Sequence, residues 1–149
     1  MNFVDPKNSQ HRPTGDYADI LHKISDDGVC PFCPSHLTKY HKRPLVEKKF
    51  WLVTDNMYPY SPVKHHRLLI HREHISHANE LSTEAWMEAQ QILNEETARL
   101  KIKGGTLIMR FGETRFTGGS VSHLHAHITQ SDPDHESYDP KKGLTMRIG

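Results

Sequence analysis

Hydrophobic positions recur along the chain with two periods, and the longer period predicts two helices. From residue 17 to residue 24 they are three to four apart, Thr14 or Asp16 can cap this segment, and Gly28 can end it. A longer helix is predicted from a cap at Ser82 or Thr83 up to the break at 104–105. Its hydrophobic stripe consists of Ala85, Trp86, Ala89, Ile92, Leu93 and Leu100.

Short runs rich in β-branched and aromatic residues predict the strands. They lie within 45–54, at 67–71 and at 106–111, and a proline-rich turn at 58–62 separates the first two. Strands joined first by a hairpin-like turn and then by one long helix predict an α+β fold. We expect a mostly antiparallel sheet with the long helix packed on it.

The length of 149 residues is suited to one domain with an ordinary hydrophobic core. Both ends of the chain are polar and lack a sustained hydrophobic period. We therefore expect an N-terminal arm at 1–14, the folded domain at 15–131 and a C-terminal arm at 132–149.

The most informative segment is a further predicted strand in which histidine alternates with hydrophobic residues. In a strand, His123, His125 and His127 would project from one face, while Leu124 and Ala126 face the core. Positions two apart are separated by roughly 6.5–7 Å, so one tetrahedral metal ion cannot easily bind all three rings. At least one histidine would remain for other chemistry.

The two cysteines, Cys30 and Cys33, have the Cys-x-x-Cys spacing of a metal clip. In a reducing compartment a metal clip is favoured over a structural disulfide. Structural zinc normally takes four protein ligands, so two histidines should complete the site, and His36 or His41 lie near enough in sequence to do so. A redox pair and two buried thiols are the alternatives.

Composition excludes several classes of partner. The net charge of +1, from 19 basic and 18 acidic residues, offers no broad surface for duplex nucleic acid. No segment resembles a secretory signal or a membrane span, so we expect a cytoplasmic protein that does not bind membranes. The chain also lacks a dinucleotide-binding glycine pattern and a Walker loop.

The loop Gly118-Gly119-Ser120 leads into the histidine segment. Glycines allow successive N–H groups to point into one concavity, where a phosphate oxygen can bind. An ordinary turn is the alternative interpretation of such a short loop.

Taken together, these motifs resemble the histidine-triad (HIT) superfamily. The resemblance is carried by 120–129, by Asn56 with Pro59-Tyr60, and by 68–74, which is similar to a strand followed by a "Pro-Lys-x-His" segment. His71 stands where that segment has proline, and the turn at 60–66 is longer than in many members. Judged by the order of these motifs along the chain, the resemblance covers roughly residues 17 to 130.

The resemblance implies a role for each candidate residue. Structural zinc would be bound by Cys30, Cys33, His74 and His123. His125 would be the nucleophile, and His127 and Ser120, with the loop amides, would stabilise charge on the phosphate oxygens. The nucleotide would contact Asn56, His66, Gly119, Ser120 and His127.

The implied function is that of a nucleotide hydrolase or nucleotidyltransferase that cleaves a purine nucleotide derivative at its α-phosphate through a nucleotidyl-histidine. Dinucleoside polyphosphates, phosphoramidates and adenylylated molecules are eligible substrates, and a homodimer is expected. One alternative is a non-catalytic nucleotide- and zinc-binding module that acts as a sensor or partner protein. Another is a metalloenzyme in which His125 and His127 are metal ligands.

Overall fold

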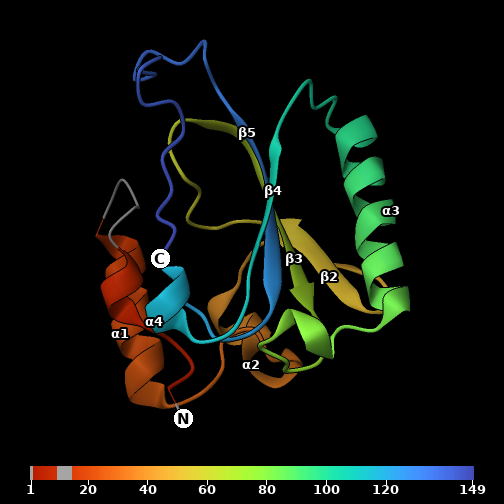
Figure 1. The fold of residues 1–149 in the computed structure, drawn as a ribbon. Coiled ribbons are helices and arrows are strands. Elements are labelled where there is room, and N and C mark those ends of the chain that lie inside the picture. The colour runs from red at the N-terminus through yellow and green to blue at the C-terminus, as the bar shows by residue number, and fades with distance from the viewer. Residues whose placement is uncertain (1, 10–14) are drawn as a thin grey trace.

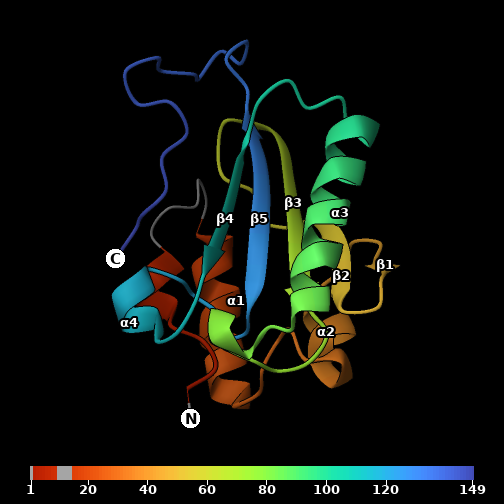
Figure 2. The same ribbon diagram turned by 45° about the vertical axis from the view of Figure 1, so that its right-hand side comes forward.

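A five-stranded antiparallel sheet forms the centre of the computed structural model, which describes residues 2–9 and 15–149 (Figure 1). The order across the sheet is β1-β2-β3-β5-β4, and the last three lie side by side in Figure 2. The α+β fold with an antiparallel sheet is therefore confirmed. The strands are β1 (Val46–Glu47), β2 (Trp51–Asp55), β3 (Val63–His71), β4 (Thr106–Arg110) and β5 (His125–Ser131).

The long helix α3 (Thr83–Arg99) covers one face of the sheet, as predicted (Figure 1). It begins at Ser82, whose hydroxyl accepts a hydrogen bond from the Ala85 N–H at 3.1 Å. The core beneath it is formed by hydrophobic side chains that alternate along the strands. These are Trp51, Val53, Leu69, Ala89, Ile92, Leu124, Ala126 and Ile128.

The composition of the buried stripe on α3 differs from the prediction at two positions. Trp86 is 46% exposed, whereas Glu96, which the hydrophobic pattern passed over, is 7% exposed. Glu96 is buried because it pairs with Arg67 of β3, which is itself buried, and with Arg99. Burial alone would raise the pKa of the Glu96 carboxyl, but the hydrogen bonds from Arg99 and Arg67 hold this pKa below its usual value.

The opposite face of the sheet is covered only in part, by two helices from the N-terminal half. The helix α2 (Pro34–Tyr40) packs Leu37 against Leu52, Leu68 and Ile70. The helix α1 (Asp16–Asp27) packs instead with Val4 and Val121. Figure 1 shows α1 and the short helix α4 (Thr114–Thr117) on the side of the sheet away from α3.

Several predicted boundaries are wrong by a few residues. Asp16 is the first residue of α1 rather than its cap: Gly15 holds the cap position, and an acidic residue in the first turn suits the helix dipole. The alternative cap, Thr14, lies outside the described residues. The helix ends at Gly28, as predicted, where a φ of 66° favours glycine. The long helix ends at Arg99, several residues before Gly104 and Gly105, where the sequence had predicted its end.

The strand β3 begins at Val63, within the segment that the sequence assigned to a turn. Its first residues pair with the end of β5 through a register shift between Val63 and His65. Conversely, the histidine strand begins two residues late, at His125. The chain at Leu124 bonds to segments outside the sheet ladder, since its N–H donates to the Ile75 carbonyl.

Parts of both expected arms contact the folded domain. Val4 is buried and forms a β-bridge with Val121, and the Asp5 N–H donates to the Ser120 carbonyl. At the other end of the chain, the Arg147 carbonyl accepts a hydrogen bond from Arg110 at 2.7 Å. The ends of the chain therefore pack around the glycine loop.

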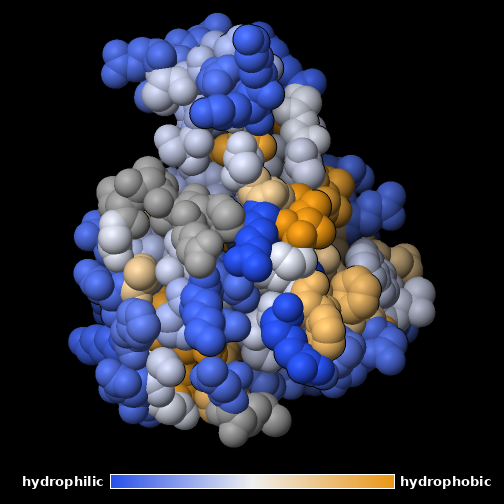
Figure 3. Space-filling model, turned by 60° about the vertical axis from the view of Figure 1, so that its left-hand side comes forward, coloured by the Kyte–Doolittle hydropathy of each residue, from blue (hydrophilic) through white to orange (hydrophobic). Residues whose placement is uncertain are grey.

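The surface is mainly hydrophilic, with smaller hydrophobic patches on the face shown in Figure 3. Large exposed hydrophobic side chains include Trp86 and Met87 on α3 and Leu107 on the edge strand β4. Among the described residues, no helix has the length and hydrophobicity that crossing a membrane requires.

The buried charge on α3 provides a test of the fold. Glu96→Gln removes the buried carboxylate that pairs with Arg67 and leaves Arg67 with the exposed carboxylate of Asp55, so we expect a loss of about 3 kcal/mol in the free energy of unfolding. The control is Glu95→Gln, which removes an exposed partner of Lys48 and should cost less than about 1 kcal/mol. Urea denaturation measures both, and equal losses would contradict the importance of the buried pair.

Candidate active site and metal centre

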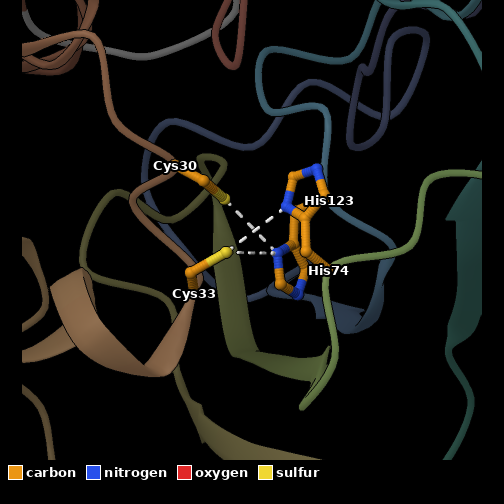
Figure 4. Close-up of side chains that lie close together, drawn as sticks. All are labelled: Cys30, Cys33, His74 and His123. Atoms are coloured by element: carbon orange, nitrogen blue, oxygen red, sulfur yellow. Dashed lines mark hydrogen bonds between the residues drawn. The ribbon is translucent and has the colours of Figure 1, made fainter.

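Two cysteines and two histidines from distant parts of the chain form one cluster. Cys30, Cys33, His74 and His123 each offer a ligand atom, and these atoms all lie within 4.8 Å of one another. In Figure 4 the sulfur atoms face the two imidazole rings across a small gap. The Nδ1 atom of His123 lies 3.3 Å from the Cys30 sulfur and 3.8 Å from the Cys33 sulfur, and His74 Nδ1 lies 3.3 Å from the Cys33 sulfur.

These distances fit one tetrahedral ion. With bonds of about 2.3 Å to sulfur and about 2.0 Å to nitrogen, tetrahedral ligand atoms lie about 3.3–3.8 Å apart. His123 Nε2 donates a hydrogen bond to the His71 carbonyl at 2.6 Å, which leaves the Nδ1 lone pair directed at the cysteines. The four residues could therefore bind a metal. The cluster includes neither His36 nor His41, so the prediction that one of them completes the site of Cys30 and Cys33 is wrong.

Burial affects the protonation of both inner ligands. It lowers the pKa of the His123 imidazole to about 4 and raises the pKa of the Cys30 thiol to about 12. A neutral imidazole is ready to bind a cation, whereas the buried thiol needs a nearby cation to lose its proton. The donor set thus suits a metal ion better than a pair of free thiolates.

His125 is held by the backbone of the neighbouring candidate ligand. Its Nδ1–H donates to the His123 carbonyl at 2.6 Å. In the neutral ring this bond leaves the lone pair on Nε2. The ring of Phe32 packs edge-on against His125, with centroids 5.0 Å apart. The side chain is half-buried and lines the cleft described below.

The proton positions of His66 and His127 follow from one backbone bond. The Tyr60 N–H donates to His66 Nδ1 at 3.1 Å, so that nitrogen carries no proton. The neutral His66 ring therefore has its proton on Nε2, which lies 2.8 Å from His127 Nδ1 and donates to it. Because His127 Nδ1 accepts this bond, neutral His127 carries its own proton on Nε2.

Asn56 lies beside this histidine pair. Its Oδ1 accepts a hydrogen bond from the Tyr58 N–H at 2.8 Å, which orients the amide. Its Nδ2 lies 3.1 Å from His66 Nε2, and because both atoms are donors when His66 carries its proton there, this is a contact and not a hydrogen bond. Asn56 lines the cleft, whereas His66 is buried behind it and is absent from the lining, so a direct contact of His66 with a nucleotide stays a prediction.

The glycine loop differs from the expected cradle of successive free amides. The Gly118 N–H donates to the Thr114 carbonyl, and the Gly119 N–H donates to the Thr117 hydroxyl at 3.1 Å. The Gly119 carbonyl accepts from Asn8 at 2.7 Å. The Ser120 hydroxyl contacts the Tyr17 hydroxyl and lines the cleft. Both glycine amides are thus engaged within the protein, and Ser120, whose hydroxyl contacts Tyr17, is the side chain that this loop presents to the cleft.

An open cleft joins these groups and encloses about 840 Å³ when the solvent at its mouth is included. His125, His127, Ser120, Gly119 and Asn56 line it, together with hydrophobic side chains of α1 and the aromatic rings of Phe32, Tyr58 and Tyr60. Among the described residues that line it, none carries a carboxylate. Such a cleft suits an anionic ligand with a flat hydrophobic part.

Sequence reasoning missed Arg110 as a residue of the site. It is paired directly with His125 across β4 and β5, so both side chains lie on the same face of the sheet. Its guanidinium donates to the Thr117 carbonyl at 3.0 Å and to the Arg147 carbonyl. The available signal was its place at the end of a strand that leads into the glycine loop.

Comparison with protein-family models gives one match, over residues 29–142, to the family described as "Scavenger mRNA decapping enzyme C-term binding". The match covers more than half of the chain and includes the metal cluster and the histidine strand. The chain belongs to this family, and so to the HIT superfamily. The resemblance inferred from the sequence is thereby confirmed. No curated protein matches the sequence.

Solved HIT structures share the fold. One described as "Hit Like Protein" is 25% identical, with a TM-score of 0.53, and the match covers 64% of this chain and 93% of that one. A HIT family hydrolase from Clostridium thermocellum is 22% identical, with a TM-score of 0.56 and coverage of 74% and 96%. A histidine triad nucleotide-binding protein from Candida albicans is 17% identical, with a TM-score of 0.60 and coverage of 81% and 83%.

The metal cluster of this HIT chain provides a second test. We expect one zinc ion per chain in the wild type, and Cys33→Ser should lose it and melt at a lower temperature, because metal binding is coupled to folding. His36→Ala is the control and should keep its zinc. Elemental analysis measures the metal content, and a Cys33→Ser protein with full zinc would rule out this ligand set.

Proposed function

We propose that this HIT protein is a nucleotide hydrolase or nucleotidyltransferase that cleaves at the α-phosphate of a purine nucleotide derivative. The observation that carries the proposal is the orientation of His125, whose Nδ1–H is bound by the His123 carbonyl beside the candidate metal cluster. That bond leaves the lone pair of neutral His125 on Nε2, which is the form that a nucleophile requires.

In the first step, His125 Nε2 attacks the α-phosphorus and forms a phosphorus–nitrogen bond. The bond from phosphorus to the leaving group breaks, and its electron pair departs with that group. In the second step, water or another acceptor such as phosphate attacks the phosphorus, and the bond to His125 breaks. The nucleotide is released and the lone pair returns to Nε2.

His127 and Ser120 would stabilise the phosphoryl group during both steps. The Nε2–H of neutral His127 can donate to a non-bridging oxygen, and His66 keeps the proton at that position. The Ser120 hydroxyl is a second donor. The guanidinium of Arg110, which the sequence did not single out, adds positive charge to a cleft in which no described lining residue carries a carboxylate.

Cys30, Cys33, His74 and His123 would hold zinc in a structural role, for which the ligand distances and the donor set provide support. Bound zinc would supply rigidity at the start of the catalytic strand. The cluster excludes His125 and His127, and the bonds of these two rings to the backbone and to His66 argue against the metalloenzyme alternative.

Eligible substrates are dinucleoside polyphosphates, nucleoside phosphoramidates and adenylylated molecules. Support comes from the names of similar structures, which include a diadenosine triphosphate hydrolase from Plasmodium falciparum, 21% identical with a TM-score of 0.51. The non-catalytic binding module remains the second candidate, since the segment 60–66, part of which lies in β3, is longer than in many members. Turnover of a generic phosphoramidate separates the two.

The homodimer, the cytoplasmic location and the limits of the arms stay predictions. For the homodimer, β4 is an edge strand whose outer side is available for pairing in the described part of the chain. It carries exposed Leu107, and Trp86 and Met87 are exposed on α3. These surfaces suit a symmetric interface that continues the sheet.

Replacing the proposed nucleophile tests the mechanism. His125→Ala should lower kcat for an adenosine phosphoramidate by at least about 10³-fold while the thermal unfolding curve stays nearly unchanged. His22→Ala, at an exposed position of α1, is the control and should keep full activity. Steady-state kinetics measure both, and an active His125→Ala enzyme would remove the mechanism.

The proposed positioning role of His66 makes a separate prediction. His66→Ala releases the proton of His127 to either nitrogen, so kcat should fall on the order of tenfold or more with a smaller change in KM. His65→Ala, the neighbouring position on β3, should change neither constant. Parallel losses in both variants would mean that the histidines contribute only to the stability of β3.

A further inference from the structure

His41 lies in the same cleft as the histidines of the triad, but none of the steps above uses it. It follows α2 directly, is 9% exposed and lines the cleft. The distance from His41 to the part of the cleft where the phosphate would bind, at His127, can be estimated from the strand pairing. Thr54, Leu68 and His127 are paired directly across β2, β3 and β5, so their side chains form a row on one face.

The length of this row matches a nucleoside. Thr54 and His127 are two strands apart, which is about 10 Å. This is roughly the length of a nucleoside from its α-phosphorus to the far edge of a purine. A nucleotide with its phosphate at His127 and its base directed over Leu68 therefore brings the far edge of the base to Thr54 and His41.

The proton of His41 is fixed by a chain of two hydrogen bonds. The single hydroxyl proton of Thr54 goes to the Pro44 carbonyl at 2.8 Å. The Thr54 oxygen must therefore accept from His41 Nε2, which lies 2.7 Å away. Burial lowers the pKa of the His41 imidazole and favours the neutral ring. The one proton of that ring is on Nε2, and Nδ1 carries a lone pair.

This lone pair belongs to a buried residue that lines a mostly hydrophobic part of the cleft. Among the described residues, none donates a hydrogen bond to His41 Nδ1. The side chains of Leu21, Ile24, Phe32 and Tyr40 line the same cleft and provide a hydrophobic surface for a flat ring. A buried acceptor without a donor costs free energy because it has lost its hydrogen bonds to water. A ligand that supplies an N–H to this atom forms a hydrogen bond and removes that cost.

We propose that His41 is a specificity residue that recognises the purine base through its Nδ1 atom, which accepts a hydrogen bond from an amino group on the edge remote from the ribose. The proposal deepens the proposed function, because it names the part of the substrate that this end of the cleft selects. A base with only a carbonyl oxygen or a C–H at that edge is bound less tightly.

Binding of nucleoside monophosphates tests this without requiring turnover. Two pairs differ by one amino group: AMP against purine riboside monophosphate, and GMP against IMP. Isothermal titration calorimetry on the full chain should show roughly tenfold tighter binding of the amino-bearing member of at least one pair. The pair that shows the difference identifies the 6-amino or the 2-amino group as the donor.

Three variants separate recognition from packing. His41→Leu should bind both members of the sensitive pair equally. His41→Asn places an amide oxygen near the position of Nδ1 and should restore part of the preference. Thr54→Val removes the acceptor that holds the proton on Nε2, so the preference should shrink although His41 is still present.

Equal binding of both members of each pair by the wild type would overturn the proposal, as would a preference that persists in His41→Leu or an absence of nucleotide binding. A base preference in a protein that fails to hydrolyse any nucleotide derivative would support the role of His41 and reject the proposed catalysis. The two conclusions are therefore tested separately.

Discussion

The structure depends on His123, which connects the candidate metal cluster to the candidate nucleophile through two parts of one residue. Its ring faces Cys30 and Cys33, and its carbonyl accepts a hydrogen bond from the Nδ1–H of His125. Because ring and carbonyl belong to the same residue, any ligand that fixes the ring also limits the movement of the carbonyl. A structural metal can thus contribute to catalysis without contacting the substrate, by keeping the lone pair of His125 in one direction.

The same principle recurs across the cleft, where backbone groups determine which nitrogen of each ring carries the proton. The Tyr60 N–H donates to His66 and so fixes the proton positions of His66 and His127. The Pro44 carbonyl accepts the Thr54 hydroxyl and so fixes the proton position of His41. Each chain begins at a backbone group, whose position depends on the fold rather than on pH. In the proposed mechanism the cleft would therefore offer a nucleophile at His125, a donor at His127 and an acceptor at His41, in a region whose described lining lacks carboxylates.

The strong periodic signals of the sequence were sufficient for the sheet and for α3, because alternation and helical spacing report directly on which side chains are buried. The four clustered residues followed instead from the resemblance to the HIT superfamily, since the local spacing around Cys30 and Cys33 pointed to His36 or His41. The errors lie where tertiary contacts override local pattern. Glu96 is buried because it pairs with Arg67, which is also buried. The Gly119 N–H is not free to bind a phosphate because it donates to the Thr117 hydroxyl. The roles of Arg110 and His41 depend on which residues are paired across strands, and that information is absent from a single sequence.

The central claim is that neighbouring histidines of the triad divide the work, with His123 bound to a metal and His125 directed at phosphorus. The most direct measurement is intact-mass analysis of the zinc-loaded protein, quenched within one turnover of an adenosine phosphoramidate and followed by peptide mapping. One zinc ion per chain and one adenylyl group, attached at His125, are expected. An adduct on His123 or His127, or two metal ions per chain with no adduct, would contradict this claim.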